Sequence, residues 1–277
     1  MAKHSKETPL GKIIGVIALK GGVGKTVTTL SLAAALSEQF KKHVLVVDAN
    51  FSSPHAALAL GFANPEVTLH HVLTHKAKIE DAIYETNHGF HLLPGALVHD
   101  RVNPYALKDK LDKLRSFYDM ILIDSSPALN EEVLASMMAS DGLLVVSTPD
   151  HVTLHSTLRA IKTAKQQQTP IHGIILNKVH GKSFELPLQA IEDASDTKVL
   201  AVLPYEVQIQ EALAAKKPAT SFKDNEAVME YRKLAAALIG QTFKDTRLST
   251  RVKNFFNPQI SRQEVNRDLL RDQGMRR

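Results

Sequence analysis

The chain has 277 residues, of which 44% are hydrophobic and 23% charged, and it contains no cysteine. This composition is typical of a globular protein that is long enough to bury one large or two small cores. The missing cysteines exclude disulfides, cysteine-ligated zinc and iron–sulfur clusters, and they fit a cytosolic protein. No run of 18 apolar residues occurs, and the polar first residues lack the apolar core of a signal peptide. We therefore expect a soluble protein.

The net charge of +5 is concentrated near the end of the chain. From Lys244 to Arg277 there are nine Lys or Arg and four Asp or Glu, so the preceding residues are neutral overall. A polyanion, whether lipid or nucleic acid, is expected to be attracted to this tail. We divide the chain into one domain over residues 10–243 and a basic tail over residues 244–277.

Short apolar runs alternate with helical patterns along the domain. The expected strands are Ile13–Leu19, Val44–Asp48, Phe90–Leu93, Met120–Asp124, Leu143–Thr148, Ile171–Asn177 and Val199–Leu203. The expected helices are Val27–Phe40, Pro104–Phe117, Glu131–Ala139, Thr153–Gln168, Leu186–Ala194 and Glu226–Ile239. Because the runs are continuously apolar, they indicate parallel strands that are covered on both faces. Repeated βα units of this kind predict an α/β, doubly wound, mostly parallel sheet flanked by helices.

A glycine-rich stretch, Lys-Gly-Gly-Val-Gly-Lys-Thr, joins the first strand to the first helix. Strand, glycine-rich turn, Lys-Thr and helix together are typical of a phosphate-binding loop, against the alternative of a turn that binds nothing. Glycines let backbone N–H groups face phosphate oxygens, and the helix N-terminus adds partial positive charge. Lys25 would neutralise the β- and γ-phosphates, and the Thr26 hydroxyl would bind Mg²⁺. The nucleotide-binding residues predicted here are Lys20, Gly21, Gly22, Val23, Gly24, Lys25, Thr26 and Val27.

Two of the expected strands are closed by an aspartate, namely Asp48 and Asp124. Ligands of parallel sheets bind at the carboxyl ends of the strands, so both carboxylates are placed to hold Mg²⁺ beside the phosphates, directly or through water. The alternative is that each aspartate caps the segment that follows it. We predict a metal site made of Thr26, Asp48 and Asp124.

The form of the loop over Lys20–Thr26, with Leu19 in place of the usual first glycine, resembles the deviant Walker A loop of the MinD/ParA ATPases. The segments Asp48–Asn50 and Asp124–Pro127 follow in the order of that family, and the resemblance covers about residues 12–240. It implies ATP and Mg²⁺ as cofactors, a homodimer that ATP closes and hydrolysis opens, and an activating or cargo protein as partner. It also implies that Lys20 reaches the other subunit's phosphates and stabilises charge on the transferred group. The alternative for this residue is an ordinary solvated lysine.

The chain departs from the family at Asn50, where an Asp-x-Asp motif would place the second aspartate, which orients the attacking water. An asparagine accepts a hydrogen bond and can still position water, but it cannot carry a proton away or attract water by charge. With Lys20, Lys25 and Asn50 as the catalytic residues, we expect slow ATP hydrolysis. The alternative is an ATP-locked scaffold with negligible hydrolysis.

Two further stretches fit recognition of a base. Asn177-Lys178 closes a strand at a place where related P-loop proteins have an Asn that hydrogen-bonds the purine, although Asn after a strand is also a common turn residue. The segment Pro204-Tyr205-Glu206 resembles the family segment whose backbone lies along the base. We add these five residues to the predicted nucleotide site: Asn177, Lys178, Pro204, Tyr205 and Glu206.

A group of histidines stands at His70, His71 and His75, and the last two have the i, i+4 spacing that can chelate a metal on a helix. Because no third ligand is suggested nearby, we expect a solvated surface here and no metal site.

The tail holds a basic amphipathic pattern at about residues 247–256. Its apolar residues recur at i, i+4, i+7 and i+8 with basic residues between them, as in helices that bind anionic membrane interfaces. The alternatives are docking on the globular body, contact with a partner protein, and nucleic-acid binding as in ParA-like members. Residues 259–277 are polar and predict a partner-binding helix or disorder. The membrane-contact candidates are Leu248, Arg251, Val252, Lys253, Phe255 and Phe256.

Together these features predict a MinD/ParA-type ATPase that dimerises on ATP and works as a slow spatial switch. We expect it to be cytoplasmic and peripheral at the inner face of the cell membrane. A ParA-like DNA-partitioning ATPase is the alternative, with DNA the less favoured partner. The sequence does not identify the cargo.

Overall fold

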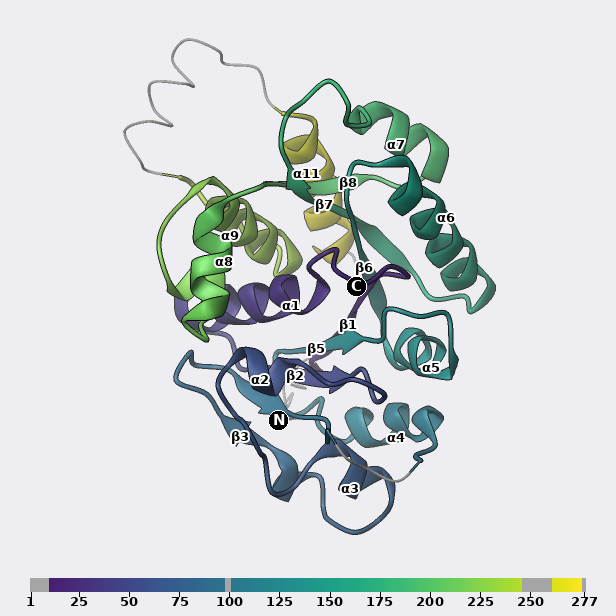
Figure 1. Cartoon of the computed structure of the whole chain (residues 1–277), viewed down its shortest axis with the longest axis vertical. Helices are drawn as coiled ribbons and strands as arrows, with labels where there is room; N and C mark the ends of the chain where they lie inside the picture. Colours follow the sequence, from purple (N-terminus) through teal and green to yellow (C-terminus); the bar gives the residue numbers. More distant parts are fainter. Residues whose placement is uncertain (1–9, 98–100, 246–260, 276–277) are drawn as a thin grey trace, which may run out of the picture.

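The computed structural model describes residues 10–97, 101–245 and 261–275, and it has one sheet between two layers of helices (Figure 1). The eight strands follow the order β3-β4-β2-β5-β1-β6-β7-β8. Neighbouring strands run parallel, except that β3 and β4 are antiparallel. The strands are β1 (Lys12–Ile17), β2 (Val44–Ala49), β3 (Tyr84–Glu85), β4 (His91–Leu93), β5 (Met120–Ser125), β6 (Gly142–Ser147), β7 (Ile171–Val179) and β8 (Val199–Pro204).

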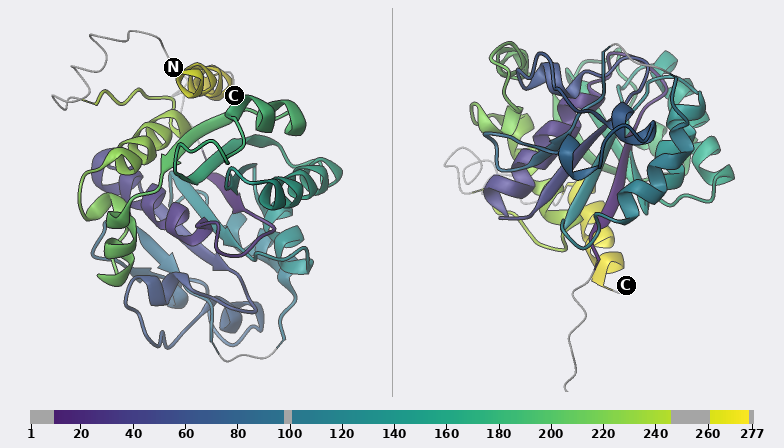
Figure 2. Two further views of the ribbon diagram at one scale, coloured as in Figure 1. Left: turned by 45° about the horizontal axis from the view of Figure 1, so that its top comes forward. Right: turned by 90° about the horizontal axis from the view of Figure 1, so that it is seen from below.

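The helices connect the parallel strands and cover both faces of the sheet (Figure 2). The longer helices are α1 (Lys25–Ala34, continued by a π-helical turn over Ala35–Gln39), α5 (Glu131–Ala139), α6 (His151–Gln166), α7 (Leu188–Ser195), α8 (Val207–Ala214), α9 (Glu226–Leu238) and α11 (Arg262–Met275). The shorter ones are α2 (Ala56–Ala59), α3 (Leu69–Leu73) and α4 (Leu107–Asp112). The predicted α/β class and the mostly parallel sheet are therefore confirmed. The sequence patterns did not suggest β3, α2, α3 or α8, whereas α11 falls within residues 259–277, for which a helix was one of the two expectations.

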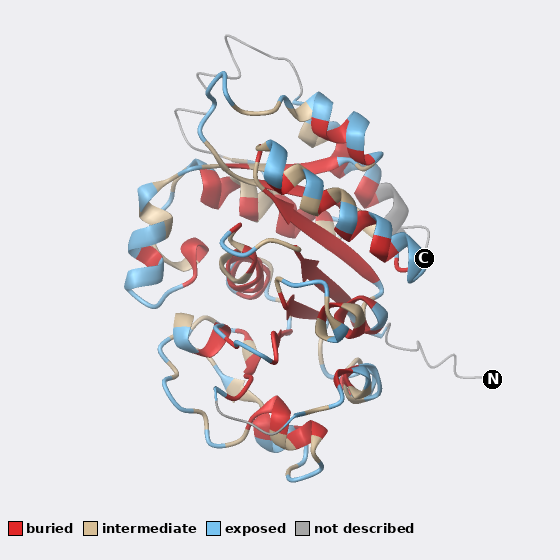
Figure 3. Cartoon of the chain, turned by 45° about the vertical axis from the view of Figure 1, so that its right-hand side comes forward, coloured by how far each residue is buried: buried red, intermediate tan, exposed pale blue. Residues whose placement is uncertain are grey.

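The core lies on both faces of the sheet because successive strand residues point to opposite sides. In β1, Ile14 and Val16 pack on the side of α1 and α9, whereas Ile13 and Ile17 pack on the side of α4, α5 and α6. Figure 3 shows the result: the strands and α1 are buried, whereas outer helices such as α6 are buried along one side only. This two-sided burial explains why the strands read as unbroken apolar runs.

The order of the central strands determines where the polar residues meet. Strand β1 lies between β5 and β6, and β5 lies between β1 and β2. Asp48 of β2 and Asp124 of β5 occupy paired positions in the register of these two strands. The carboxyl ends of three adjacent strands therefore bring the glycine-rich loop and both aspartates to one edge of the sheet.

Helix α11 (Arg262–Met275), near the end of the chain, packs against the globular domain. Helix α11 packs against α9 and β8, and its Leu270, which is 8% exposed, joins the hydrophobic core beside Leu200. The described part of residues 259–277 is thus a helix bound to its own domain. The predicted amphipathic segment 247–256, with all six membrane-contact candidates, lies outside the described residues. Within the described ranges, no helix has the length and apolarity needed to cross a bilayer.

Candidate nucleotide-binding site

The glycine-rich loop turns from β1 into α1 with backbone conformations that favour glycine. Gly22 has φ 78° and Gly24, which precedes α1 as its N-cap, has φ 95°. A Cβ atom on Gly24 would also lie 2.2 Å from Asn177 Nδ2. Position 24 therefore requires glycine both for its left-handed backbone and for the close approach of β7.

Two residues at the end of β7 donate hydrogen bonds to backbone carbonyls of the glycine-rich loop. Asn177 Nδ2 donates a hydrogen bond to the Val23 carbonyl over 2.7 Å, and Lys178 Nζ donates to the Gly22 carbonyl over 2.7 Å. These two residues were predicted from the sequence as base contacts. Their contacts in the structure position the phosphate loop, and any contact with a purine would be additional to that role.

Lys25, Thr26 and the two aspartates form a buried polar cluster beneath the loop. Lys25 Nζ lies 3.4 Å from Asp124 Oδ1, and Thr26 Oγ1 donates to Asp124 Oδ2 over 2.5 Å. Asp48 is fully buried and accepts hydrogen bonds from the backbone N–H groups of Asn50, at 3.2 Å, and Ala56, at 2.9 Å. Each aspartate thus has a local partner, but the cluster holds two carboxylates and one cation.

The electrostatics of this cluster fit a divalent cation. Burial, and then the neighbouring Asp124 carboxylate, raise the pKa of Asp48 to about 7, although N–H donors and Lys25 act against this rise. The excess negative charge is what Mg²⁺ would neutralise, and carboxylate and hydroxyl oxygens are the ligands that it prefers. Mg²⁺ takes its remaining ligands from phosphates and water. In the described part of the chain, no group of three or more His, Cys, Asp or Glu residues is placed to hold a metal ion.

Asn50 lies at the side of the loop, in the segment between β2 and α2. It is 7% exposed, and its Nδ2 donates to the Ser53 carbonyl. The amide nitrogen is therefore engaged by the protein, and the carbonyl oxygen is the group that can accept a hydrogen bond from water. His55, at the start of α2, also lines the cleft and was not anticipated.

A cleft of about 370 Å³ extends from the glycine-rich loop to the end of β8. Tyr205, which is 43% exposed, stacks on His180 with ring centroids 4.8 Å apart. The cleft is lined by all of the predicted nucleotide-binding residues, which are residues 20–27 with Asn177, Lys178, Pro204, Tyr205 and Glu206. It is also lined by Asn50, by Pro127 at the end of the segment Asp124–Pro127, and by residues that the sequence patterns did not reveal, namely His55, Ile209 and Leu213. The structure therefore joins segments that are far apart in the sequence into one concave site.

Lys20 stands at the mouth of the cleft with its side chain 38% exposed. Its Nζ donates to Thr153 Oγ1 over 2.7 Å and lies 3.5 Å from Asp150 Oδ1. Asp150 caps α6 by accepting from Thr153 N over 2.9 Å. Partial burial alone would raise the pKa of Asp150, but hydrogen bonds from Thr148 and Thr153 and the charge of Lys20 lower it to about 2. Lys20 is therefore held by a carboxylate of its own chain that is charged at neutral pH.

The histidine group differs in part from the expected solvated surface. His70 is 3% exposed; its Nδ1 accepts from Ala96 N over 2.9 Å, and its Nε2 lies 3.2 Å from the Phe51 carbonyl. His71 Nδ1 accepts from Thr68 N over 3.1 Å in a capping box, and His75 is exposed. The expectation of a solvated surface is wrong for His70, because the chain folds two loops over it.

The fold and the loop together define a P-loop nucleotide-binding protein, and a family profile described as an AAA domain matches residues 11–175. An uncharacterized ATP-binding protein of Methanocaldococcus jannaschii is 32% identical, over 83% of this chain and 89% of its own length. The cell division ATPase MinD of Pyrococcus furiosus has a TM-score of 0.76 and 32% identity, covering 82% of this chain and 97% of its own. The septum site-determining protein MinD of Pyrococcus horikoshii, solved with Mg-ADP, has the same TM-score and identity, covering 82% and 95%. The chain belongs to the MinD/ParA family of P-loop ATPases.

Proposed function

We propose that this protein binds Mg²⁺ and ATP in the cleft, closes into a homodimer when ATP is bound, and reopens after slow hydrolysis. The observation that supports this proposal is that the phosphate loop and the predicted base-binding residues line the same cleft. Lys25 and Thr26 each contact Asp124 at the phosphate end of this cleft, and Tyr205 lies at the end where a base would bind. The Mg-ADP bound to the Pyrococcus horikoshii relative supports the same pair of ligands.

In this mechanism the protein supplies position and charge. The loop N–H groups and Lys25 would hold the β- and γ-phosphates, and Thr26, Asp124 and Asp48 would hold Mg²⁺ directly or through water. Mg²⁺ would neutralise charge that develops on the phosphates. Asn50 would orient the attacking water through its carbonyl oxygen. Because this group cannot accept a proton as a carboxylate can, hydrolysis would be slow.

The face around the mouth of the cleft supports a second copy of the chain as partner. Val152, next to the Thr153 that binds Lys20, is 70% exposed, and Leu129, two residues after the cleft residue Pro127, is 45% exposed. Burial of apolar side chains on this face would favour association, and it would bring Lys20 towards the phosphates of the other subunit.

The test of the dimer is the molar mass of the full chain in solution with Mg²⁺ and either ATP or ADP. We expect a dimer with ATP and a monomer with ADP. Lys20→Gln should bind ATP but remain monomeric, and Lys113→Gln, which changes an exposed lysine on another surface, should dimerise normally. A wild-type chain that binds ATP and stays monomeric at every concentration would contradict the switch. A dimer that releases no phosphate would identify the ATP-locked scaffold instead.

We also propose that the protein acts in the cytoplasm at the inner face of the cell membrane, through the segment 247–256. The support is its sequence pattern of apolar residues separated by basic ones. Truncation before this segment would also remove α11, which is bound to the domain, so single substitutions are the cleaner test. Leu248→Glu should abolish ATP-dependent sedimentation with anionic liposomes. Ser249→Glu, which adds the same charge at a position outside the apolar pattern, should have a smaller effect. Retention by DNA in place of liposomes would support the partitioning alternative.

A further inference from the structure

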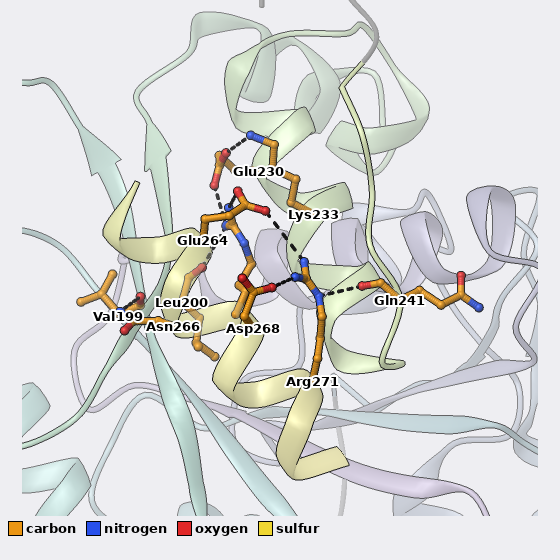
Figure 4. A network of polar contacts seen from close by, with 10 residues as sticks. Val199, Leu200, Glu230, Lys233, Gln241, Glu264, Asn266, Asp268 and Arg271 are labelled. Atoms are coloured by element: carbon orange, nitrogen blue, oxygen red, sulfur yellow. Dashed lines mark hydrogen bonds and ion pairs between the residues drawn. The ribbon is translucent and has the colours of Figure 1, made fainter. Parts of the chain in front are cut away.

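Arg267, on α11, is buried inside the protein although it is charged. Its side chain is 1% exposed. Nη1 donates to Glu230 Oε2 of α9 over 2.8 Å and to the Leu200 carbonyl of β8 over 3.0 Å, and Nη2 donates to Glu264 Oε2 over 3.0 Å. Figure 4 shows this network between α9, α11 and β8. A single guanidinium therefore connects a strand to a helix that lies beside it.

The bond to Leu200 falls at an irregularity in β8. Ile174 of β7 pairs with Val199, but the next residue, Ile175, pairs with Ala201, so Leu200 is skipped. A bulge of this kind leaves a residue out of the ladder and changes the direction of the strand. Arg267 donates a hydrogen bond to the carbonyl of the skipped residue, Leu200, and this bond stabilises the bulge.

The neighbouring residue of α11 binds the same strand. Asn266 Nδ2 donates to the Val199 carbonyl over 2.8 Å and to Glu192 Oε1 of α7 over 2.8 Å. Glu192 Oε1 also accepts from Val199 N over 2.8 Å. Both backbone groups of Val199 are thus satisfied by side chains. Since β8 is the edge strand of the sheet, the polar side of α11 covers an edge that would otherwise lack partners.

The two elements that Arg267 joins lead to opposite ends of the cleft. Strand β8 continues directly into Pro204-Tyr205-Glu206, at the proposed base end. Helix α9 is fixed to the phosphate end, because the Tyr231 hydroxyl lies 3.2 Å from Thr28 Oγ1 on α1, two residues after Thr26. The direction of β8 relative to α9 therefore determines the position of the base segment relative to the phosphate loop.

We propose that Arg267 is a positioning residue for the nucleotide. By bonding both the β8 bulge and α9, it aligns the base segment, Pro204-Tyr205-Glu206, with the phosphate loop. This inference rests on the proposed binding of ATP in the cleft. A buried arginine is stable only while its partners are in place, so removing one member of the network should release β8. A ligand that needs both ends of the cleft should then bind more weakly, whereas a ligand that needs only the phosphate loop should not.

The experiment compares ATP with inorganic tripolyphosphate, which has no base, in equilibrium binding to the full chain with Mg²⁺. Arg267→Gln should weaken ATP binding by about fivefold or more, a typical coupling between distant groups, and leave tripolyphosphate binding within about twofold. Arg267→Lys should restore part of the affinity, since it retains the charge but not the fork whose two nitrogens reach Glu230 and Glu264 together.

The matched control is Arg271→Gln. Arg271 lies on the same helix and is also buried, and its Nη2 lies 3.9 Å from Glu264, but its hydrogen bonds go to the Gln241 carbonyl and to Asp268, neither of which belongs to β8. We expect this variant to bind ATP as the wild type does. Equal ATP affinity for a folded Arg267→Gln variant, or equal weakening of ATP and tripolyphosphate, would overturn the proposal. Failure of the wild type to bind ATP at all would instead refute the proposed function.

A second measurement covers the case in which neither Arg267 variant folds. In the wild type, binding free energies are reciprocal, so a ligand that uses the base segment must in turn stabilise the docking of α11. ATP, but not tripolyphosphate, should slow hydrogen exchange at the α11 amides around Arg267. Equal exchange with both ligands would overturn the proposal without the use of any variant.

Discussion

Lys20 and Thr153 are joined by a hydrogen bond of 2.7 Å that fixes the loop lysine to the N-terminus of α6 in the same chain. Asp150, 3.5 Å from Lys20 Nζ, adds a charge to this contact. The lysine that the family resemblance assigns to the other subunit thus has an intramolecular partner in the single chain. If Lys20 acts across a dimer, it must leave this partner first.

We predict that Asp150→Asn strengthens ATP-driven dimerisation. Asparagine still caps α6 by accepting from Thr153 N, so the fold should be retained while the charge that holds Lys20 is lost. An exposed ion pair contributes at most about 1 kcal/mol, and each dimer releases two of them, so the dimer dissociation constant should fall by up to about thirtyfold. Sedimentation equilibrium with ATP measures it. Asp196→Asn, which breaks the exposed pair with Lys165, is the control, and an equal or weaker dimer in Asp150→Asn would contradict the prediction.

We predict that Asn50→Asp accelerates hydrolysis. The carboxylate would attract the attacking water and accept its proton, and positioned acid–base groups contribute about a hundredfold or more in many enzymes. We expect at least about tenfold faster phosphate release in a single turnover with saturating ATP. Asn50→Ala, which can neither orient water nor accept a proton, should be slower than wild type. If the wild type already releases phosphate as fast as Asn50→Asp, the asparagine does not limit turnover.

We predict that the metal-free protein loses stability as the pH rises from about 4 to about 7. In this window the folded chain holds a proton on Asp48, whose pKa is raised to about 7, while the unfolded chain, with the ordinary value of 3.8, does not. The folded state binds more protons, so the free energy of unfolding decreases with rising pH and becomes flat above pH 7.

The variant Asp48→Asn should remove this dependence. At pH 8 in EDTA it should be more stable than wild type by up to about 4 kcal/mol, and at pH 5 the difference should shrink, because wild-type Asp48 is then largely neutral. Urea unfolding at both pH values gives the comparison. A variant that is no more stable than wild type at pH 8 would show that the repulsion between the Asp48 and Asp124 carboxylates does not destabilise the folded protein.

We predict that Gly24→Ala damages both the fold and the site. A left-handed backbone costs an alanine about 1–2 kcal/mol, and the added Cβ would displace Asn177, 2.2 Å away, from its bond to the Val23 carbonyl. Gly240→Ala is the matched control, because Gly240 has φ 71° with nothing within 4 Å of the added Cβ. Urea unfolding and ATP binding should show a larger loss for Gly24→Ala. Equal losses in stability for the two variants, with ATP binding intact, would show that the contact between Asn177 and the Val23 carbonyl is not needed for the site.

The sequence by itself determined the fold class and the phosphate end of the cleft. Short continuous apolar runs that alternate with helical patterns are typical of parallel strands buried on both faces, because both sides of such a strand contact helices. The glycine-rich loop is one local segment, and Asp48 and Asp124 each close such a run. Their proximity followed from a general rule of parallel sheets, which requires no knowledge of side-chain packing.

Only the tertiary structure decided the contacts that connect distant segments. Arg267 belongs to a polar helix, and charged residues are ordinarily exposed, so no local pattern marked it as buried between β8 and α9. The same holds for His70, and the contact of the Asn177 amide with the Val23 carbonyl of the phosphate loop was likewise not marked by any local pattern. A polar side chain becomes stable inside a protein only when specific partners surround it. Those partners come from strands and helices that are far apart in the sequence and meet only in the folded chain.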